Sequence, residues 1–166
     1  MLKHIPNVLT LLNLSAGLIA VLVIIQTDHP YKNLIIPALI IFGGIIDFFD
    51  GFLARKLGRT SQLGKNLDSF ADIITFGIAP VAFVSYLATQ PLPIAAASLA
   101  YILAAAYRLA RFNLHAPADH FHGLPITAAG IILVLVAPYL GSLLNLILML
   151  LLAAAMVSKI KIKRLL

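Results

Sequence analysis

The chain has no cysteine, no tryptophan and no glutamate, and only 11% of its 166 residues are charged. The lack of cysteine excludes a disulfide framework and a thiolate metal site. An ordinary soluble domain is about 25% charged and about 45–50% apolar, whereas 61% of this chain is hydrophobic. There is too little polar material to cover a globular surface, so we expect lipid to be the solvent for most of the chain.

Six apolar segments suit helices that cross a bilayer, which needs about 20 residues, although two of the six are short. They lie at 6–26, 34–55, 67–87, 92–112, 124–140 and 142–158. The gaps between them are brief, so consecutive helices should be antiparallel. We therefore expect an all-α, polytopic membrane protein with six transmembrane helices, forming a single transmembrane domain over residues 1–166.

The basic residues predict how this protein is oriented. The chain has 12 lysines and arginines, and with six spans all of them except Lys32 fall on one face. The positive-inside rule then places both termini and the loops at 55–66 and 111–123 in the cytoplasm. We interpret the net charge of +6 as a topology signal and a contact for anionic membrane lipids, not as a nucleic-acid site. We expect a multi-pass protein of the cell (inner) membrane.

The acidic residues are all aspartates, and four of the six lie in one otherwise apolar helical hairpin. Asp47 and Asp50 are spaced i, i+3, and Asp68 and Asp72 are spaced i, i+4, so each pair shares one helix face. Antiparallel packing should bring Asp50 level with Asp68 and Asp47 level with Asp72. Four like charges this close repel one another unless cations lie among them. The hairpin therefore predicts a metal site.

The ligand chemistry indicates which metals would bind. Ligation by oxygen alone suits Mg²⁺ or Mn²⁺, with Ca²⁺ also possible, and four carboxylates can share two divalent ions about 3.5–4 Å apart. The competing interpretation is that these acids cap helices or line a pore, and Asp68 would suit a helix N-terminus. Four acids on facing stripes favour a functional site, because intramembrane ionisable groups are costly.

Small residues and one arginine accompany the acids. Gly51 would let a ligand approach the backbone closely, although glycine is also common where membrane helices pack. Arg55 could face a phosphate or simply anchor the helix at the interface. Ala54 and Gly64 carry little information individually.

Taken together, these residues read Asp47-x2-Asp50-Gly51-x2-Ala54-Arg55-x8-Gly64-x3-Asp68-x3-Asp72. The pattern resembles, at every position and spacing, the signature of the CDP-alcohol phosphotransferase family. The resemblance implies six transmembrane helices, a homodimer and a metal site open to the cytoplasm. It also implies transfer of a phosphate-linked group from a CDP-alcohol to a second alcohol, with release of CMP. The CDP group would be bound by Asp47, Asp50, Gly51, Ala54, Arg55, Gly64 and Asp68.

A narrower likeness, to the membrane-type phosphatidylserine synthases of bacteria and archaea, covers nearly the whole chain. It rests on Ile5-Pro6-Asn7 with Thr10 and Asn13, on LDSFADIITFGIAP at 67–80, on RLARFN at 108–113, on FHGLPITAAG at 121–130 and on MVSKIK at 156–161. Thr127 stands where that pattern has proline. The likeness implies that CDP-diacylglycerol and L-serine react to give phosphatidylserine and CMP.

Hypotheses about further residues combine this resemblance with the chemistry and position of the side chains. Asp72 would be catalytic, as a metal ligand that also takes the proton from the serine hydroxyl. Candidates for binding the acceptor or a lipid phosphate are Asn7, Asn13, Asn66, Arg108 and Arg111, although both arginines also suit positive-inside anchoring.

Three alternatives stay open. The same fold could use another acceptor, such as inositol phosphate or glycerol 3-phosphate, or an archaeal ether-lipid donor. A protein of another class, a small cation transporter, could also place aspartates in a membrane. A transporter would more often spread its polar residues through the membrane depth, whereas here they cluster toward one face.

Overall fold

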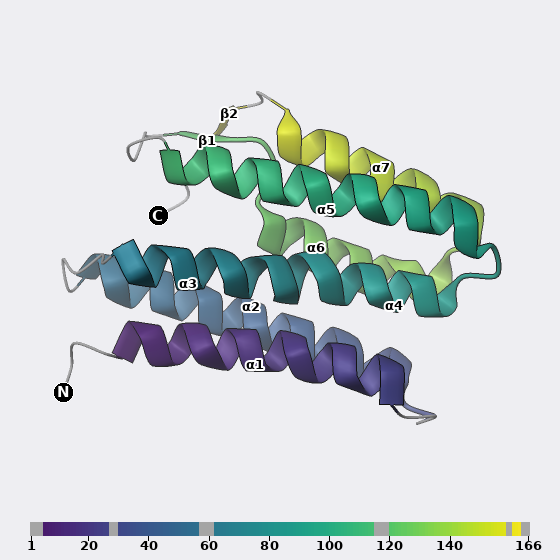
Figure 1. Ribbon diagram of the computed structural model, residues 1–166, viewed down its shortest axis with the longest axis horizontal. Helices are drawn as coiled ribbons and strands as arrows, with labels where there is room; N and C mark the ends of the chain where they lie inside the picture. The colour runs from purple at the N-terminus through teal and green to yellow at the C-terminus, as the bar shows by residue number, and fades with distance from the viewer. Residues whose placement is uncertain (1–4, 27–29, 57–61, 115–119, 159–160, 164–166) are drawn as a thin grey trace.

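The computed structural model describes residues 5–26, 30–56, 62–114, 120–158 and 161–163, and nearly all of them are helical (Figure 1). The elements are α1 (Ile5–Gln26), α2 (Lys32–Lys56), α3 (Gln62–Asp72), the π-helix η2 (Ile73–Ile78), α4 (Ala79–Leu87), α5 (Pro91–Leu114), β1 (His120–His122), α6 (Ile126–Val136), the 3-10 turn η3 (Ala137–Tyr139), α7 (Ser142–Val157) and β2 (Lys161–Lys163). The exception to the expected all-α fold is the short antiparallel pair β1–β2, in which Phe121 lies opposite Ile162.

Four helical segments are long and apolar enough to cross a membrane: α1, α2, the continuous rod from α3 to α4, and α5. Helices α6 and α7 are apolar but shorter. All six predicted segments are thus helices, whereas four have the length and composition of a membrane span. The third helix begins at Gln62, before the predicted start at Leu67. The prediction missed this turn because it is polar, and an apolar pattern does not reveal a polar turn.

Successive long helices run antiparallel along a common direction (Figure 1). As a result, the beginnings of α1, α3 and α6 lie at the same end of the bundle as the ends of α2, α5 and α7. Helix α1 packs against α2 and against the α3–η2 segment, α6 packs against α2 and η2, and α7 packs against α5. Residues that are distant in sequence therefore meet at one end.

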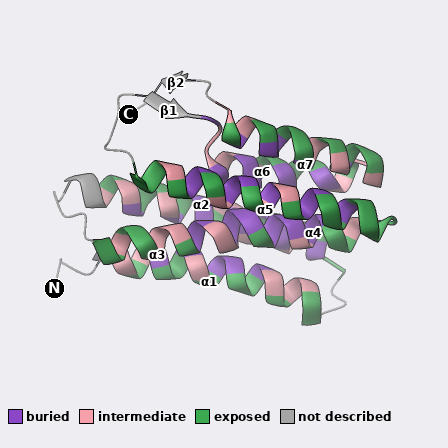
Figure 2. Cartoon of the chain, turned by 45° about the horizontal axis from the view of Figure 1, so that its top comes forward, coloured by how far each residue is buried: buried purple, intermediate pink, exposed green. Residues whose placement is uncertain are grey.

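The outer surface of the bundle is apolar. Buried residues line the faces where helices meet, and exposed residues cover the outside (Figure 2). Many of the exposed residues are large and hydrophobic, such as Leu99 at 60% and Leu103 at 58% exposed on α5. A water-soluble monomer rarely exposes so much contiguous apolar surface. The arrangement fits a helical membrane protein, in which lipid contacts the outer face.

The rod from α3 to α4 widens into the π-helix η2 directly after Asp72. Pro80 follows this segment, and a proline lacks an amide proton and crowds the carbonyl four residues earlier, here that of Phe76. The Phe76 carbonyl accepts a hydrogen bond from the buried Tyr101 hydroxyl of α5, at 3.2 Å. The irregular turn is therefore tied to α5 by a polar contact.

Helix α6 approaches the same turn through a glycine. A Cβ atom added to Gly130 would lie 2.8 Å from the Phe76 carbonyl oxygen and 2.9 Å from its Cα. Both are backbone atoms that cannot move aside cheaply. Close approach at small residues is the usual way in which membrane helices associate.

Lys32 is a buried basic residue at the start of α2. Only 4% of its surface is exposed. Its ammonium group donates to the carbonyl of Ile24 near the end of α1, at 3.0 Å, and lies 4.5 Å from the centroid of the Tyr86 ring on α4. This cation thus joins α1, α2 and α4 at the end of the bundle opposite the aspartates.

Replacing Gly130 with alanine should lower the free energy of unfolding by about 1–3 kcal/mol, because overpacking against backbone forces the helices apart. Gly77 offers a matched control in the same region, since a Cβ there would meet only the Ile126 Cδ1 atom, at 4.0 Å. Thermal unfolding in detergent should show a lower midpoint for Gly130→Ala and no loss for Gly77→Ala. An unchanged midpoint for Gly130→Ala would contradict this account of the packing.

Candidate metal centre

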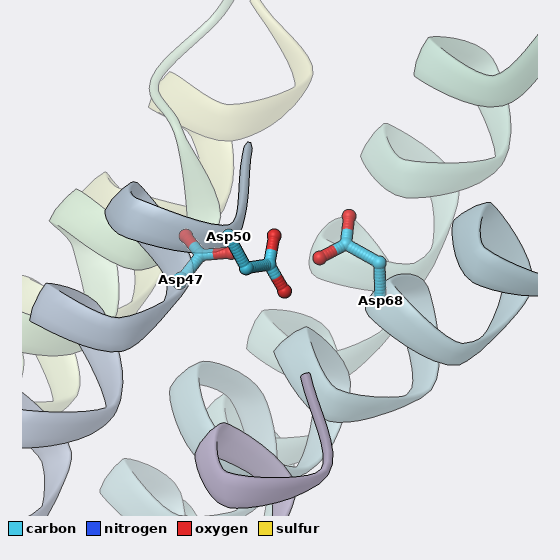
Figure 3. Close-up of side chains that lie close together, drawn as sticks. All are labelled: Asp47, Asp50 and Asp68. Atoms are coloured by element: carbon cyan, nitrogen blue, oxygen red, sulfur yellow. The ribbon is translucent and has the colours of Figure 1, made fainter. Parts of the chain in front are cut away.

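Three aspartates converge at one end of the bundle. Asp47, Asp50 and Asp68 each offer a carboxylate oxygen, and these oxygens all lie within 4.8 Å of one another. Asp47 and Asp50 come from α2 and Asp68 comes from α3, and Figure 3 shows the carboxylates of Asp50 and Asp68 facing each other. Asp50 is buried and the other two are half-buried. The structure thus brings together three of the four predicted metal ligands.

Local structure explains why these side chains meet. The i, i+3 spacing aims Asp47 and Asp50 from one face of α2. Asp68 lies in the second turn of α3, beyond the first-turn amide groups that have no partner within the helix, so it does not cap the helix. On α2, Gly43 precedes Asp47 by one turn, and a Cβ there would lie 2.8 Å from both the Asn13 Oδ1 and the Thr75 Cγ2 atoms. The glycine therefore lets α1 and η2 come close beside the acids.

Two threonine hydroxyls contact the α2 carboxylates. The Thr10 hydroxyl of α1 donates to Asp50 Oδ2 at 2.6 Å, and the Thr127 hydroxyl of α6 donates to Asp47 Oδ2 at 3.2 Å. Neither threonine was among the predicted site residues. Thr10 could have been noticed because it lies on one face of α1 with Asn7 and Asn13, and Thr127 because it departs from the proline of the pattern.

Asp72 stands outside the group of three and is buried at the end of α3, with 7% exposed. Its Oδ1 atom has no hydrogen-bond partner within the part of the chain that the structure describes. Its carboxylate interacts electrostatically with the other aspartates and with Arg108 of α5. Arg108 is itself buried, and its Nε atom also lacks a partner among the described residues. Two opposite charges with spare hydrogen-bonding capacity thus adjoin the three carboxylates.

Asn13 is the most buried of the other predicted polar residues. It is fully buried on α1, one turn from Thr10. Its backbone carbonyl accepts a hydrogen bond from the Thr75 hydroxyl at 3.0 Å. Neither amide atom of its side chain has a partner in the described ranges. A buried amide without partners is costly, which is consistent with a side chain that binds a ligand.

The remaining residues of the aspartate motif lie nearby along α2 and α3. A Cβ added to Gly51 would meet no described atom within 4 Å, so the backbone of α2 is open to a ligand beside Asp50. Gly64 is half-buried in the first turn of α3. Ala54 and Arg55 belong to the last turn of α2, but their side chains lie outside the described residues.

The other candidates for acceptor binding are placed differently. Asn7 is half-buried near the start of α1. Asn66 is exposed and lines a groove of about 420 Å³ between α3 and α5. Arg111 donates to the carbonyl oxygens of Val157 and Ser158 at the end of α7, at 3.2 and 3.3 Å. The guanidinium of Arg111 therefore holds α7 against α5, and its predicted contact with an acceptor stays a prediction.

The three converging carboxylates fit a divalent metal ion. Each supplies a hard oxygen ligand of the kind that Mg²⁺, Mn²⁺ and Ca²⁺ prefer. Without a cation, three like charges within 4.8 Å of one another would repel strongly in apolar surroundings. The arrangement is able to bind a divalent metal next to an apolar surface, where an amphipathic phosphate ester could reach it.

Comparison with known sequences identifies the family of this chain. Residues 3–160 match the profile of the family described as CDP-alcohol phosphatidyltransferase. The chain belongs to the CDP-alcohol phosphatidyltransferase family. The prediction of a membrane-embedded transferase of this kind, made from the aspartate motif, is confirmed.

Several characterised proteins resemble this CDP-alcohol phosphatidyltransferase. The CDP-diacylglycerol–serine O-phosphatidyltransferase of Bacillus subtilis is 37% identical over 140 residues, covering 82% of this chain and 76% of the relative. The protein of that name from Methanocaldococcus jannaschii is 35% identical over 95% of this chain and 72% of its own length. The archaetidylserine synthase of Methanothermobacter thermautotrophicus is 34% identical over 76% of this chain and 54% of its own length.

Replacing Asp68 with asparagine should stabilise the metal-free protein, because it removes one of three neighbouring like charges. The repulsion that is relieved is on the order of 1–3 kcal/mol at the dielectric typical of proteins. The same change should reduce the rise in the unfolding midpoint that Mg²⁺ or Mn²⁺ produces. Thermal unfolding with EDTA and with each metal would measure both effects.

Asp28→Asn, in the segment between α1 and α2, is the matched control and should alter neither midpoint. A destabilised metal-free Asp68→Asn protein with a full response to metal would argue against a site at these carboxylates.

Proposed function

We propose that this protein transfers the phosphatidyl group of CDP-diacylglycerol to L-serine, giving phosphatidylserine and CMP. The observation that carries the proposal is the convergence of Asp47, Asp50 and Asp68 at one end of long apolar helices. A lipid pyrophosphate is amphipathic, so carboxylates at the edge of an apolar bundle are where its charged part would lie. Two relatives named for serine transfer support serine as the acceptor.

Asp47, Asp50, Asp68 and Asp72 would hold two divalent ions, Mg²⁺ or Mn²⁺. When bound, the ions would neutralise the pyrophosphate and the CMP leaving group, which is the main catalytic requirement in displacement at phosphorus. The three converging carboxylates of Asp47, Asp50 and Asp68 would make most of the contacts with the metal ions. Asp72 lies beside them, with one carboxylate oxygen that no described group contacts.

Asp72 is proposed as the general base. The serine hydroxyl transfers its proton to the Asp72 carboxylate while its oxygen forms a bond to the phosphorus that carries diacylglycerol. The bond from that phosphorus to the oxygen of CMP breaks, and CMP leaves. No enzyme nucleophile is required, so the reaction is a direct displacement. The burial of Asp72 and its interaction with Arg108 would hold the carboxylate in place.

The donor nucleotide would lie along the α2–α3 hairpin. Open space beside the Gly51 backbone supports contact with the CDP group there. Besides Asp47, Asp50 and Asp68, the proposed CDP-binding residues are Gly51, Ala54, Arg55 and Gly64.

For the acceptor, Arg108 and Asn13 have the strongest support. Both are buried and both have side-chain atoms without partners among the described residues. A guanidinium is well suited to a carboxylate such as that of serine. Asn7, Asn66 and Arg111 stay as further candidates for contacting the acceptor or a lipid phosphate.

The proposed topology has six membrane spans, with both termini and the active site in the cytoplasm and the protein in the cell (inner) membrane as a homodimer. The six helical segments and the placement of the basic residues support the spans and the orientation, and the homodimer rests on the family resemblance alone. An ether-lipid donor is a second possibility, supported by the relative named as an archaetidylserine synthase.

The reaction is tested by incubating the purified protein in detergent with CDP-diacylglycerol, Mg²⁺ or Mn²⁺, and one acceptor at a time. The panel contains L-serine, inositol phosphate and glycerol 3-phosphate, and both CMP and the lipid product are measured. Serine should support CMP release and EDTA should abolish it. Turnover with another alcohol but not with serine would overturn the assigned acceptor.

Asp72→Asn should lower turnover by at least about 100-fold, the usual contribution of a positioned base, while CDP-diacylglycerol still binds. Turnover is measured by CMP release and binding by protection from thermal unfolding. A fully active Asp72→Asn protein would remove this residue from the mechanism.

Arg108→Lys should raise the KM for serine about ten-fold or more, because a lysine cannot reproduce the two parallel hydrogen bonds of a guanidinium. The KM for CDP-diacylglycerol should change much less. Equal changes in the two KM values would argue that Arg108 does not contact the acceptor.

A further inference from the structure

We propose that Thr10 and Thr127 are positioning residues, whose hydroxyls orient the Asp50 and Asp47 carboxylates for metal binding. The proposal rests on the function proposed above. Each threonine donates to the Oδ2 atom of its aspartate, and each comes from a helix other than the one that carries the acids. The two carboxylates of α2 are thus held separately, one from α1 and the other from α6.

Electrostatic repulsion explains why such donors are needed. In the metal-free protein, the carboxylates of Asp47, Asp50 and Asp68 repel one another and would turn apart about their side-chain bonds. A hydrogen bond to one carboxylate oxygen restricts that rotation and offsets part of the repulsion. Partners of this kind are known to tune metal sites, because they fix the ligand before the ion arrives.

The helix packing delivers both threonines to the acids. Gly44 precedes Asp47 by one turn on α2, and a Cβ there would already lie 3.4 Å from the Thr127 Cγ2 atom. A side chain larger than alanine at this position would crowd the Thr127 methyl group and the Ile131 side chain, whose Cδ1 atom would lie 3.0 Å from that Cβ. Rotation about the Cα–Cβ bond of threonine is restricted. Packing of the methyl group therefore also fixes the direction of the hydroxyl toward Asp47.

The two contacts differ in strength. Thr10 is buried and its bond to Asp50 measures 2.6 Å, whereas Thr127 is half-buried and its bond to Asp47 measures 3.2 Å. Short hydrogen bonds to ionised acceptors are the stronger ones. Loss of the Thr10 hydroxyl should therefore weaken metal binding more than loss of the Thr127 hydroxyl.

The test measures metal affinity directly, without substrate or turnover. Thr10→Val and Thr127→Val keep the side-chain shape and remove the donor. Binding of Mn²⁺ to the purified protein in detergent is followed by the paramagnetic resonance signal of the free ion. Each valine variant should bind Mn²⁺ at least about 10-fold more weakly, the lower bound for loss of such partners, and the loss should be larger for Thr10→Val. Thr10→Ser and Thr127→Ser should recover most of the affinity.

Thr89→Val is the matched control. Thr89 pairs with the Ser142 hydroxyl at 2.9 Å, at the end of the bundle away from the aspartates, and its loss should leave Mn²⁺ affinity unchanged. Should Thr10→Val fail to fold, Thr127→Val decides alone, because its half-buried site tolerates the change more easily.

The outcomes separate this proposal from the proposed function. Wild-type affinity in both valine variants would overturn the positioning role and leave the transferase assignment intact. Equal losses in the serine and valine variants would also overturn it, because the hydroxyl would not be the cause. A wild-type protein that binds no Mn²⁺ would overturn both.

Discussion

The metal centre depends on holding like charges together among apolar helices. Carboxylate oxygens of Asp47, Asp50 and Asp68 lie within 4.8 Å of one another, in surroundings where repulsion is screened far less than in water. The bundle offsets part of this repulsion with fixed polar groups, the hydroxyls that α1 and α6 supply. The acids therefore need neighbours from several helices, and the fold brings these neighbours to one end.

The position of Asp72 also depends on contacts between helices, through the irregular turn of the third helix. Asp72 is the last residue of α3, and the π-helix begins at the next residue. That turn is fixed from two sides, by the Tyr101 hydroxyl and by the close approach of Gly130. π-Helical turns occur frequently at functional sites. The direction of the Asp72 side chain is thus linked to α5 and α6, although neither helix carries an acid.

The sequence predicts the features that local patterns determine. Apolar runs locate all six helices. The spacing of the aspartates on two neighbouring helices predicts that four carboxylates meet, and the structure brings three of them together. Contacts between distant residues have no such signal. Thr10 and Thr127 bond to acids 40 and 80 residues away, and Arg111 reaches carbonyls 46 and 47 residues away. Whether α6 and α7 span the membrane also depends on more than their apolar character, because both are short.

The burial of Lys32 has a consequence for how the bundle forms. Before the helices pack, this lysine is a hydrated cation at the start of the second helix. After packing, the Ile24 carbonyl and the Tyr86 ring take the place of its water. Assembly of α1, α2 and α4 is therefore coupled to dehydration of one charge. The folded protein therefore exposes less of this charge to water, at the end of the bundle away from the aspartates, than the unpacked chain does.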